Sequence, residues 1–227
     1  MTYEELIQDT EYKEIASLSH KEIKNFIVNE ITENQQWARA ANLYQLAGIL
    51  AFMLGTFKAF MPYFIHQQAE GLLWLVAGIV FSFTILIVFH ELVHALAYLA
   101  IGARHLFFGC QPKKFMFYVQ ADKAVVDYRQ FKIIALSPTV LISFLSLIGM
   151  IFFYQQPAFY FFISVFGLHS LFAAGDFGLL CFFQNRPELE IVTFDVKEEG
   201  KTYFYGRKKK KCFVVIFVGN NILRGTI

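Results

Sequence analysis

The chain has 227 residues, of which 56% are hydrophobic and only 17% charged, with a formal net charge of +2. Soluble domains carry about 25% charged residues, so this composition predicts a membrane protein. The near-neutral charge gives no indication of a nucleic-acid partner. Three widely spaced cysteines form neither a disulfide framework nor a C-x-x-C metal motif: Cys110, Cys181 and Cys212.

Residues 1–40 form a polar leader of mixed charge. Ser19 and Glu22 have the spacing of a helix-capping box. The apolar residues that follow recur with helical period: Ile23, Phe26, Ile27 and Ile31. The pattern predicts an amphipathic helix that lies on the membrane surface or packs against the rest of the protein.

Four long apolar stretches follow, and a helix needs about 20 apolar residues to cross a bilayer. The second stretch is longer than this, so we expect it to tilt or to protrude. We therefore predict an all-α membrane protein with four transmembrane helices, organised as a leader (1–40), a core (41–184) and a tail (185–227). The four stretches are residues 42–61, 71–102, 131–154 and 159–183.

The basic residues predict the orientation of these helices. Residues 62–70 and 155–158 contain no Lys or Arg, whereas the leader, the loop 103–129 and the tail are basic. Because basic loops stay in the cytoplasm, we expect both termini to be cytoplasmic.

Short β-hairpins are expected on the cytoplasmic side. In the loop 103–129, two aromatic or β-branched runs at 115–119 and 124–128 flank a polar turn. In the tail, the runs 191–196 and 202–205 flank a second turn at 197–201. Both patterns are typical of hairpins.

The second apolar stretch contains His90-Glu91-Leu92-Val93-His94. Residues four apart lie on one face of a helix, so the two imidazoles can bind one zinc ion with Zn–N bonds of about 2.0–2.1 Å. Glu91 lies beside them and is placed to act as a general base toward water.

The membrane setting strengthens this interpretation. A carboxylate inside a transmembrane helix costs about 2.5–3.5 kcal/mol on insertion scales. One Glu and two His in a single turn therefore require compensation, which a bound metal ion provides. The alternative interpretation is a polar cluster bonded to other helices, or a proton relay.

Asp176, in the fourth stretch, is the candidate for a third ligand, since zinc peptidases use three protein ligands and leave one position for water. It lies seven residues before Phe183, and His94 lies seven before Ile101. At a rise of about 1.5 Å per residue, both lie about 10 Å below the cytoplasmic interface. The alternative is an aspartate paired with a basic residue or a helix terminus.

His169 competes with Asp176 for this role. It lies seven residues earlier, on the same helix face but about 10 Å away along the axis, so the two cannot easily bind one ion. We prefer Asp176. We expect His169 to line the substrate cavity or to hydrogen-bond another helix.

Ser137 and Pro138 fall at the same depth in the third stretch, seven residues after Gln130. Proline opens the helical hydrogen-bond ladder and frees carbonyl groups that need a polar neighbour. We interpret the pair as a widened active-site wall, with Ser137 offering a hydrogen bond to substrate. A simple kink is the alternative.

Together these motifs resemble those of the intramembrane zinc metalloproteases of the site-2 protease class. More closely, the chain is similar to the putative zincin peptidase family of small, four-span bacterial membrane proteins. The resemblance covers residues 40–205 and rests on His90-Glu91-Leu92-Val93-His94, Ser137-Pro138 and Gly175-Asp176.

The resemblance implies that His90, His94 and Asp176 bind zinc and that Glu91 is the catalytic acid/base. The site-2 class places glycine directly after its aspartate, whereas Phe177 follows here.

We therefore expect zinc-dependent peptide hydrolysis within the cytoplasmic half of the bilayer. The protein would be a multi-pass protein of the cell membrane, and its partners would be the lipid bilayer and a membrane-embedded polypeptide substrate. Two alternatives remain: a non-catalytic metal-binding membrane factor, and a proton or ion transporter that uses the same polar cluster.

Overall fold

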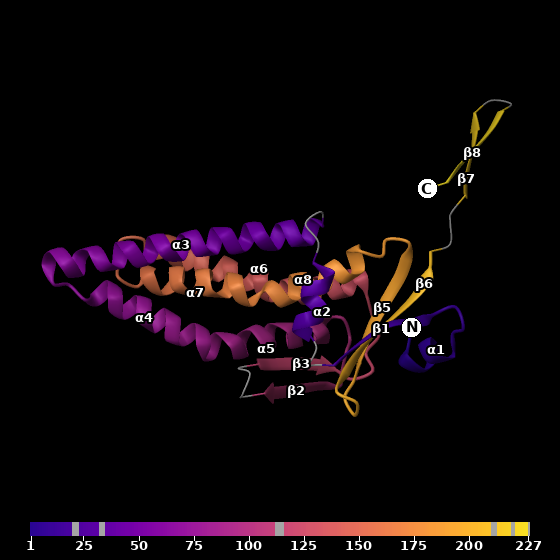
Figure 1. The fold of residues 1–227 in the computed structure, drawn as a ribbon, viewed down its shortest axis with the longest axis horizontal. Helices are drawn as coiled ribbons and strands as arrows, with labels where there is room; N and C mark the ends of the chain where they lie inside the picture. Colours follow the sequence, from indigo (N-terminus) through magenta and orange to yellow (C-terminus); the bar gives the residue numbers. More distant parts are fainter. Residues whose placement is uncertain (20–22, 32–34, 112–115, 210–212, 219–220, 227) are drawn as a thin grey trace.

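A bundle of long helices carries a layer of short β-sheets at one end in the computed structural model of the chain (Figure 1). The structure describes residues 1–19, 23–31, 35–111, 116–209, 213–218 and 221–226.

Among the described residues, three helical segments are long and apolar enough to cross a membrane. These are α3 (Gln36–His66), α6 (Tyr128–Phe152) and the consecutive helices α7 (Phe159–Phe172) and α8 (Ala174–Gln184), which count as one segment. A further pair, α4 (Glu70–Phe83) and α5 (Ile85–Ala100), qualifies as a fourth span if the two are taken together.

The second predicted span is not straight, because the axis of α5 departs by 47° from that of α4. Thr84 lies at the break, with φ −121° and ψ −83°. Its hydroxyl donates to the Val80 carbonyl at 2.7 Å, and so satisfies a backbone acceptor within the bend. Beyond the break, α5 runs to the sheet end of the molecule (Figure 1).

Small residues let the helices of the bundle approach closely. A Cβ added at Gly48 of α3 would lie 2.0 Å from the Ser170 hydroxyl of α7, and one at Gly78 of α4 would lie 2.7 Å from the Phe161 carbonyl. Close approach through glycine is typical of membrane helices, whose packing depends on van der Waals contact. The central helix α7 is thereby held against both α3 and α4.

The prediction of an all-α protein is wrong, because 18% of the chain is strand and 63% is helix. The largest sheet is antiparallel, with the order β1-β6-β5-β4. Its strands are β1 (Lys13–Ser19), β6 (Lys201–Lys208), β5 (Leu189–Val196) and β4 (Val126–Asp127). β1 lies in the leader, and its residues pair with partners more than 180 positions later, since Ser19 pairs with Lys201 (201 − 19 = 182). Such long-range pairing leaves no local sequence signal.

Two further sheets have two strands each. β2 (Leu106–Gln111) pairs with β3 (Met116–Ala121), and β7 (Phe213–Val218) pairs with β8 (Asn221–Thr226). The hairpin predicted between 115–119 and 124–128 is therefore wrong in its partners, because β3 turns back on β2, and β4 joins β5 instead. The tail hairpin is confirmed as β5 and β6.

The leader also contains two helices, α1 (Tyr3–Gln8) and α2 (Ile23–Glu30). The predicted helix corresponds to α2, although Glu22 of its capping box lies outside the described residues. Glu30, at the end of α2, accepts two hydrogen bonds at 2.8 and 2.9 Å from the guanidinium of Arg186, a residue just beyond the end of α8. Burial alone would raise the pKa of Glu30, but the bonds from Arg186 and Asn185 outweigh it and lower that pKa.

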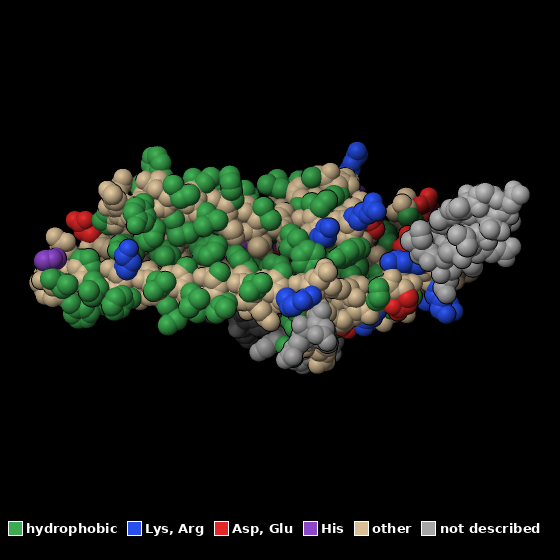
Figure 2. Space-filling model, turned by 90° about the horizontal axis from the view of Figure 1, so that it is seen from above, with side chains coloured by type: hydrophobic (Ala, Val, Ile, Leu, Met, Phe, Trp, Pro, Cys, Tyr) green, Lys and Arg blue, Asp and Glu red, His purple; other side chains and the backbone are tan. Residues whose placement is uncertain are grey.

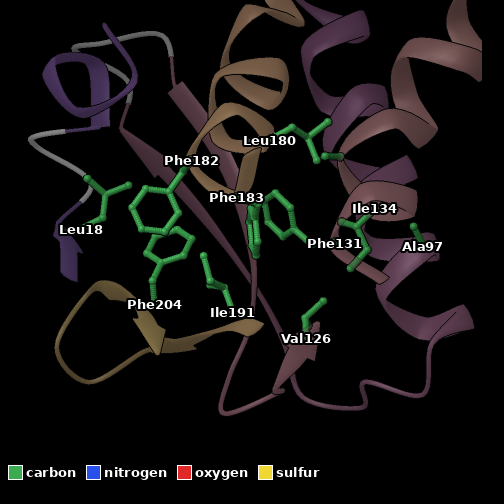
Figure 3. Packing of buried hydrophobic residues seen from close by; sticks show 11 residues of the cluster. Leu18, Ala97, Val126, Phe131, Ile134, Leu180, Phe182, Phe183, Ile191 and Phe204 are labelled. Carbon is green, nitrogen blue, oxygen red and sulfur yellow. The ribbon is translucent and has the colours of Figure 1, made fainter. Parts of the chain in front are cut away.

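One hydrophobic core joins the four-stranded sheet to the ends of α5, α6 and α8 (Figure 3). At its centre, the ring of Phe182 of α8 packs against the ring of Phe204 of β6, with centroids 4.4 Å apart and the ring planes tilted by 46°. Both rings are almost fully buried. The sheet is therefore packed firmly against the helix ends that carry the polar residues described below.

Phe204→Ala should lower the free energy of unfolding by about 3–5 kcal/mol, since it deletes a buried aromatic ring and leaves a cavity. Denaturant unfolding of the detergent-solubilised protein measures this. Phe108→Ala, at an exposed position on β2, is the control and should change the value by less than about 0.5 kcal/mol. Equal effects of the two substitutions would contradict the described core.

Candidate metal centre

Helix α5 brings two histidines and a glutamate to one place, because its α-helical turn puts His90 above His94 with Glu91 beside them. Donor atoms of these three side chains all lie within 4.8 Å of one another. All three side chains also line a cavity of about 350 Å³ between the helix ends and the sheets.

Asp176 of α8 completes this group. The Nε2 atoms of His90 and His94 lie 3.1 Å apart. The Asp176 carboxylate approaches them with Oδ2 at 3.3 Å from His90 Nε2 and Oδ1 at 3.4 Å from His94 Nε2. His94 and Asp176 are 82 positions apart in the sequence (176 − 94 = 82) and yet meet at one point in the bundle.

Proline in α6 orients His94. Pro138 has no N–H, so the carbonyl four residues earlier, on Ile134, lacks its helical partner. That carbonyl accepts a hydrogen bond from His94 Nδ1 at 2.9 Å and one from the Ser137 hydroxyl at 2.8 Å. The bond requires a proton on His94 Nδ1, so in the neutral imidazole Nε2 carries a free lone pair directed at the cluster.

His90 is oriented by a chain of polar groups on three other helices. Its Nδ1 lies 3.1 Å from His169 Nε2 on α7. His169 Nδ1 in turn lies 3.0 Å from the Tyr44 hydroxyl of α3, which lies 2.7 Å from the Ser143 hydroxyl of α6. When each of these groups donates a hydrogen bond to the next, from His90 toward Ser143, His90 Nε2 also keeps a free lone pair toward the cluster.

Strand β3 holds Glu91. The Val119 N–H donates to Glu91 Oε2 at 3.1 Å. In the antiparallel ladder with β2, alternate N–H groups of β3 point away from the partner strand, and Val119 is one of them. The hairpin next to α5 therefore fixes the carboxylate at the edge of the cavity.

The sequence-predicted residues thus take distinct places. His90, Glu91, His94 and Asp176 line the cavity, but its lining does not include Ser137, Pro138 or His169. Ser137 and Pro138 act on the Ile134 carbonyl, and His169 lies on the side of His90 opposite Asp176.

Sequence reasoning missed Tyr44, Ser143 and the Val119 N–H, which lie on α3, α6 and β3. Their roles depend on how these elements pack against α5 and α7. No spacing in the sequence indicates that packing. Pro138 alone gave a usable signal, because proline frees a helical carbonyl and that carbonyl needs a hydrogen-bond donor.

A zinc ion fits the donor set of this cluster. Tetrahedral zinc with bonds of about 2.0–2.1 Å places its ligand atoms roughly 3.3–3.4 Å apart, close to the 3.1, 3.3 and 3.4 Å distances found here. Asp176 Oδ2 is buried and has no hydrogen-bond partner among the described residues. A buried carboxylate oxygen facing two nitrogen lone pairs is stabilised by a cation between them.

Comparison with known proteins agrees with this chemistry. Residues 83–189 match the model of a family described as "putative zincin peptidase". The matched segment runs from the end of α4 to the start of β5 and contains all four residues of the cluster, so the chain is similar to a zincin-like family there. No curated protein and no solved structure matches the chain.

His169→Leu should weaken zinc binding by about 10–100-fold, because it removes the partner that fixes the ring of His90. Competition with a chelator measures the affinity, and thermal unfolding of the metal-free protein reports any loss of stability. His66→Leu, which removes an exposed histidine at the far end of α3, is the control. Unchanged zinc affinity in the His169 variant would show that the chain of polar groups does not support the centre.

Proposed function

We propose that the protein is an intramembrane zinc peptidase that hydrolyses a peptide bond near the cytoplasmic side of the bilayer. The observation that carries the proposal is the convergence of His90, His94 and Asp176, with the Glu91 carboxylate beside them and an adjoining cavity. Zincins need this combination of two histidines, a further ligand and a general base.

The distribution of side chains supports a membrane location and an orientation. On the face that Figure 2 shows, hydrophobic side chains predominate along the helices, and Lys and Arg side chains gather at the end with the sheets. By the positive-inside rule, the sheet end faces the cytoplasm. Both termini then lie on the cytoplasmic side.

The cluster lies inside the bilayer in this orientation. His94 is six residues before Ala100, the last residue of α5, which corresponds to about 9 Å of helix. Asp176 is eight residues before Gln184, the last residue of α8, or about 12 Å. Both depths support hydrolysis in the cytoplasmic half of the membrane.

His90, His94 and Asp176 would hold the zinc ion. When bound, zinc would supply Lewis-acid polarisation of the scissile carbonyl and would lower the pKa of water. Glu91 takes a proton from the attacking water and passes it to the leaving amine. The Val119 N–H holds Glu91 Oε2 in place and leaves its other oxygen for this transfer.

The substrate would be a membrane-embedded polypeptide that enters the cavity in extended form. A helical peptide bond is enclosed by its own backbone hydrogen bonds, so a substrate helix must unwind before its carbonyl reaches the centre. The cavity lies between the bundle and β3, β5 and β6, where polar groups can bind an unwound backbone.

Glu91→Gln should reduce hydrolysis at least about 10²-fold while zinc remains bound, because the substitution removes the base and keeps all three ligands. The assay uses single-span model peptides in proteoliposomes and detects new termini by mass spectrometry. Glu70→Gln, at the first residue of α4, is the control.

Other outcomes of this experiment identify the alternatives. A metal-binding factor without catalysis would bind zinc and release no new termini from any peptide with either variant. A transporter would show proton or metal flux into the liposomes without new termini. Hydrolysis that survives Glu91→Gln would contradict the proposed mechanism.

A further inference from the structure

The cavity beside Glu91 has a second polar end that the proposed hydrolysis does not use. There, Asp195 of β5 lines the wall together with Gln120 of β3 and Thr202 of β6. Asp195 is 8% exposed and Gln120 is 5% exposed. Neither residue contacts the donor atoms of the zinc ligands in any described hydrogen bond.

Asp195 is a buried carboxylate with neutral partners. Its Oδ1 accepts a hydrogen bond from the Thr202 hydroxyl at 2.6 Å, and its Oδ2 accepts a long one from the Ala121 N–H at 3.4 Å. No Lys, Arg or His in the described part of the chain forms an ion pair with it. Burial raises the pKa of Asp195 to about 6, so near neutral pH the fold holds a charge that lacks a cation. Such a charge is unfavourable until a cation pairs with it.

Gln120 provides an independent observation at the same place. Its side-chain Nε2 is buried and has no hydrogen-bond partner among the described residues. A buried amide donor without an acceptor is unfavourable. This end of the cavity therefore offers both an acceptor for a cation and a donor for a carbonyl.

The spacing along β3 relates this end to the catalytic base. The Val119 N–H binds Glu91, and the Ala121 N–H binds Asp195. Two residues of a strand span about 6.6–6.8 Å, so the two carboxylates are held about 7 Å apart on one strand edge. A long side chain near the scissile bond can cover this distance.

We propose that Asp195 and Gln120 form a subsite for a basic side chain, Lys or Arg, close to the scissile bond of the substrate. The ammonium or guanidinium group pairs with the Asp195 carboxylate, and the Gln120 amide donates to a backbone carbonyl of the same segment. The inference rests on the proposed peptidase function and adds a substrate class to it.

The chemistry of membrane substrates agrees with such a subsite. Lys and Arg are enriched in the residues that follow a transmembrane helix on the cytoplasmic side. With the sheet end in the cytoplasm, Asp195 faces this region of a substrate. The subsite then selects polypeptides that are cleaved where an apolar segment meets its first basic residue.

Peptide binding to the full-length protein with Glu91→Gln tests the subsite without turnover. The probes are short fluorescent peptides, blocked at both ends and apolar except for one central lysine, norleucine or glutamate. Fluorescence anisotropy in a neutral detergent gives their affinities. We expect the lysine peptide to bind about tenfold more tightly than the norleucine peptide, and the glutamate peptide no more tightly than norleucine.

Adding Asp195→Asn should abolish the preference for lysine. Adding Glu190→Gln, which removes an exposed carboxylate from the same strand, should leave the preference unchanged. Equal binding of the lysine and norleucine peptides, or a lysine preference that survives Asp195→Asn, would overturn the proposal. If Asp195→Asn fails to fold, the glutamate peptide still decides, because glutamate binding as tightly as lysine is incompatible with a carboxylate subsite.

Zinc content of the same preparations separates this inference from the proposed function. Bound zinc without a lysine preference would refute the subsite and leave the metal centre standing. A lysine preference in a protein that binds no zinc would refute the metal centre instead.

Discussion

Two imidazole nitrogens and a carboxylate lie within 3.1–3.4 Å of one another in the interior of an apolar bundle. Ionisable groups among apolar helices are costly unless a partner compensates them. In the proposed centre, a zinc ion held by His90, His94 and Asp176 would remove this penalty, because it would bind the lone pairs that the surrounding hydrogen bonds leave free. The surrounding helices and strands hold these groups through hydrogen bonds.

Each group is oriented by a different part of the fold. A carbonyl freed by Pro138 in α6 orients His94, and His169 of α7 orients His90. Strand β3 holds Glu91 through a backbone N–H. A loop alone would hold these groups less rigidly than helices and a strand that are packed into one core, and a catalytic geometry depends on such rigidity. The sheets, packed on the helix ends through Phe182 and Phe204, thereby become part of the cavity wall.

The convergence of the site residues was more predictable from sequence than the fold. The H-E-x-x-H spacing depends only on helical periodicity, and matching depths in two apolar stretches sufficed to pair His94 with Asp176. Strand pairing was less predictable, since β1 joins β6 across most of the chain and β4 has only two residues. The bend at Thr84 was not predicted either, since the stretch 71–102 contains no proline. The polar chain through Tyr44 required knowledge of how α3 packs on α7.

The measurement that tests the account most directly is the zinc content of the detergent-purified protein, determined by elemental mass spectrometry. Wild type and His94→Ala are compared, with His105→Ala, beyond the end of α5, as the control. We expect about one zinc ion per chain in wild type and in the control, and its loss in His94→Ala. Wild-type protein that binds no zinc after reconstitution with the metal, or zinc that persists in His94→Ala, would contradict this expectation.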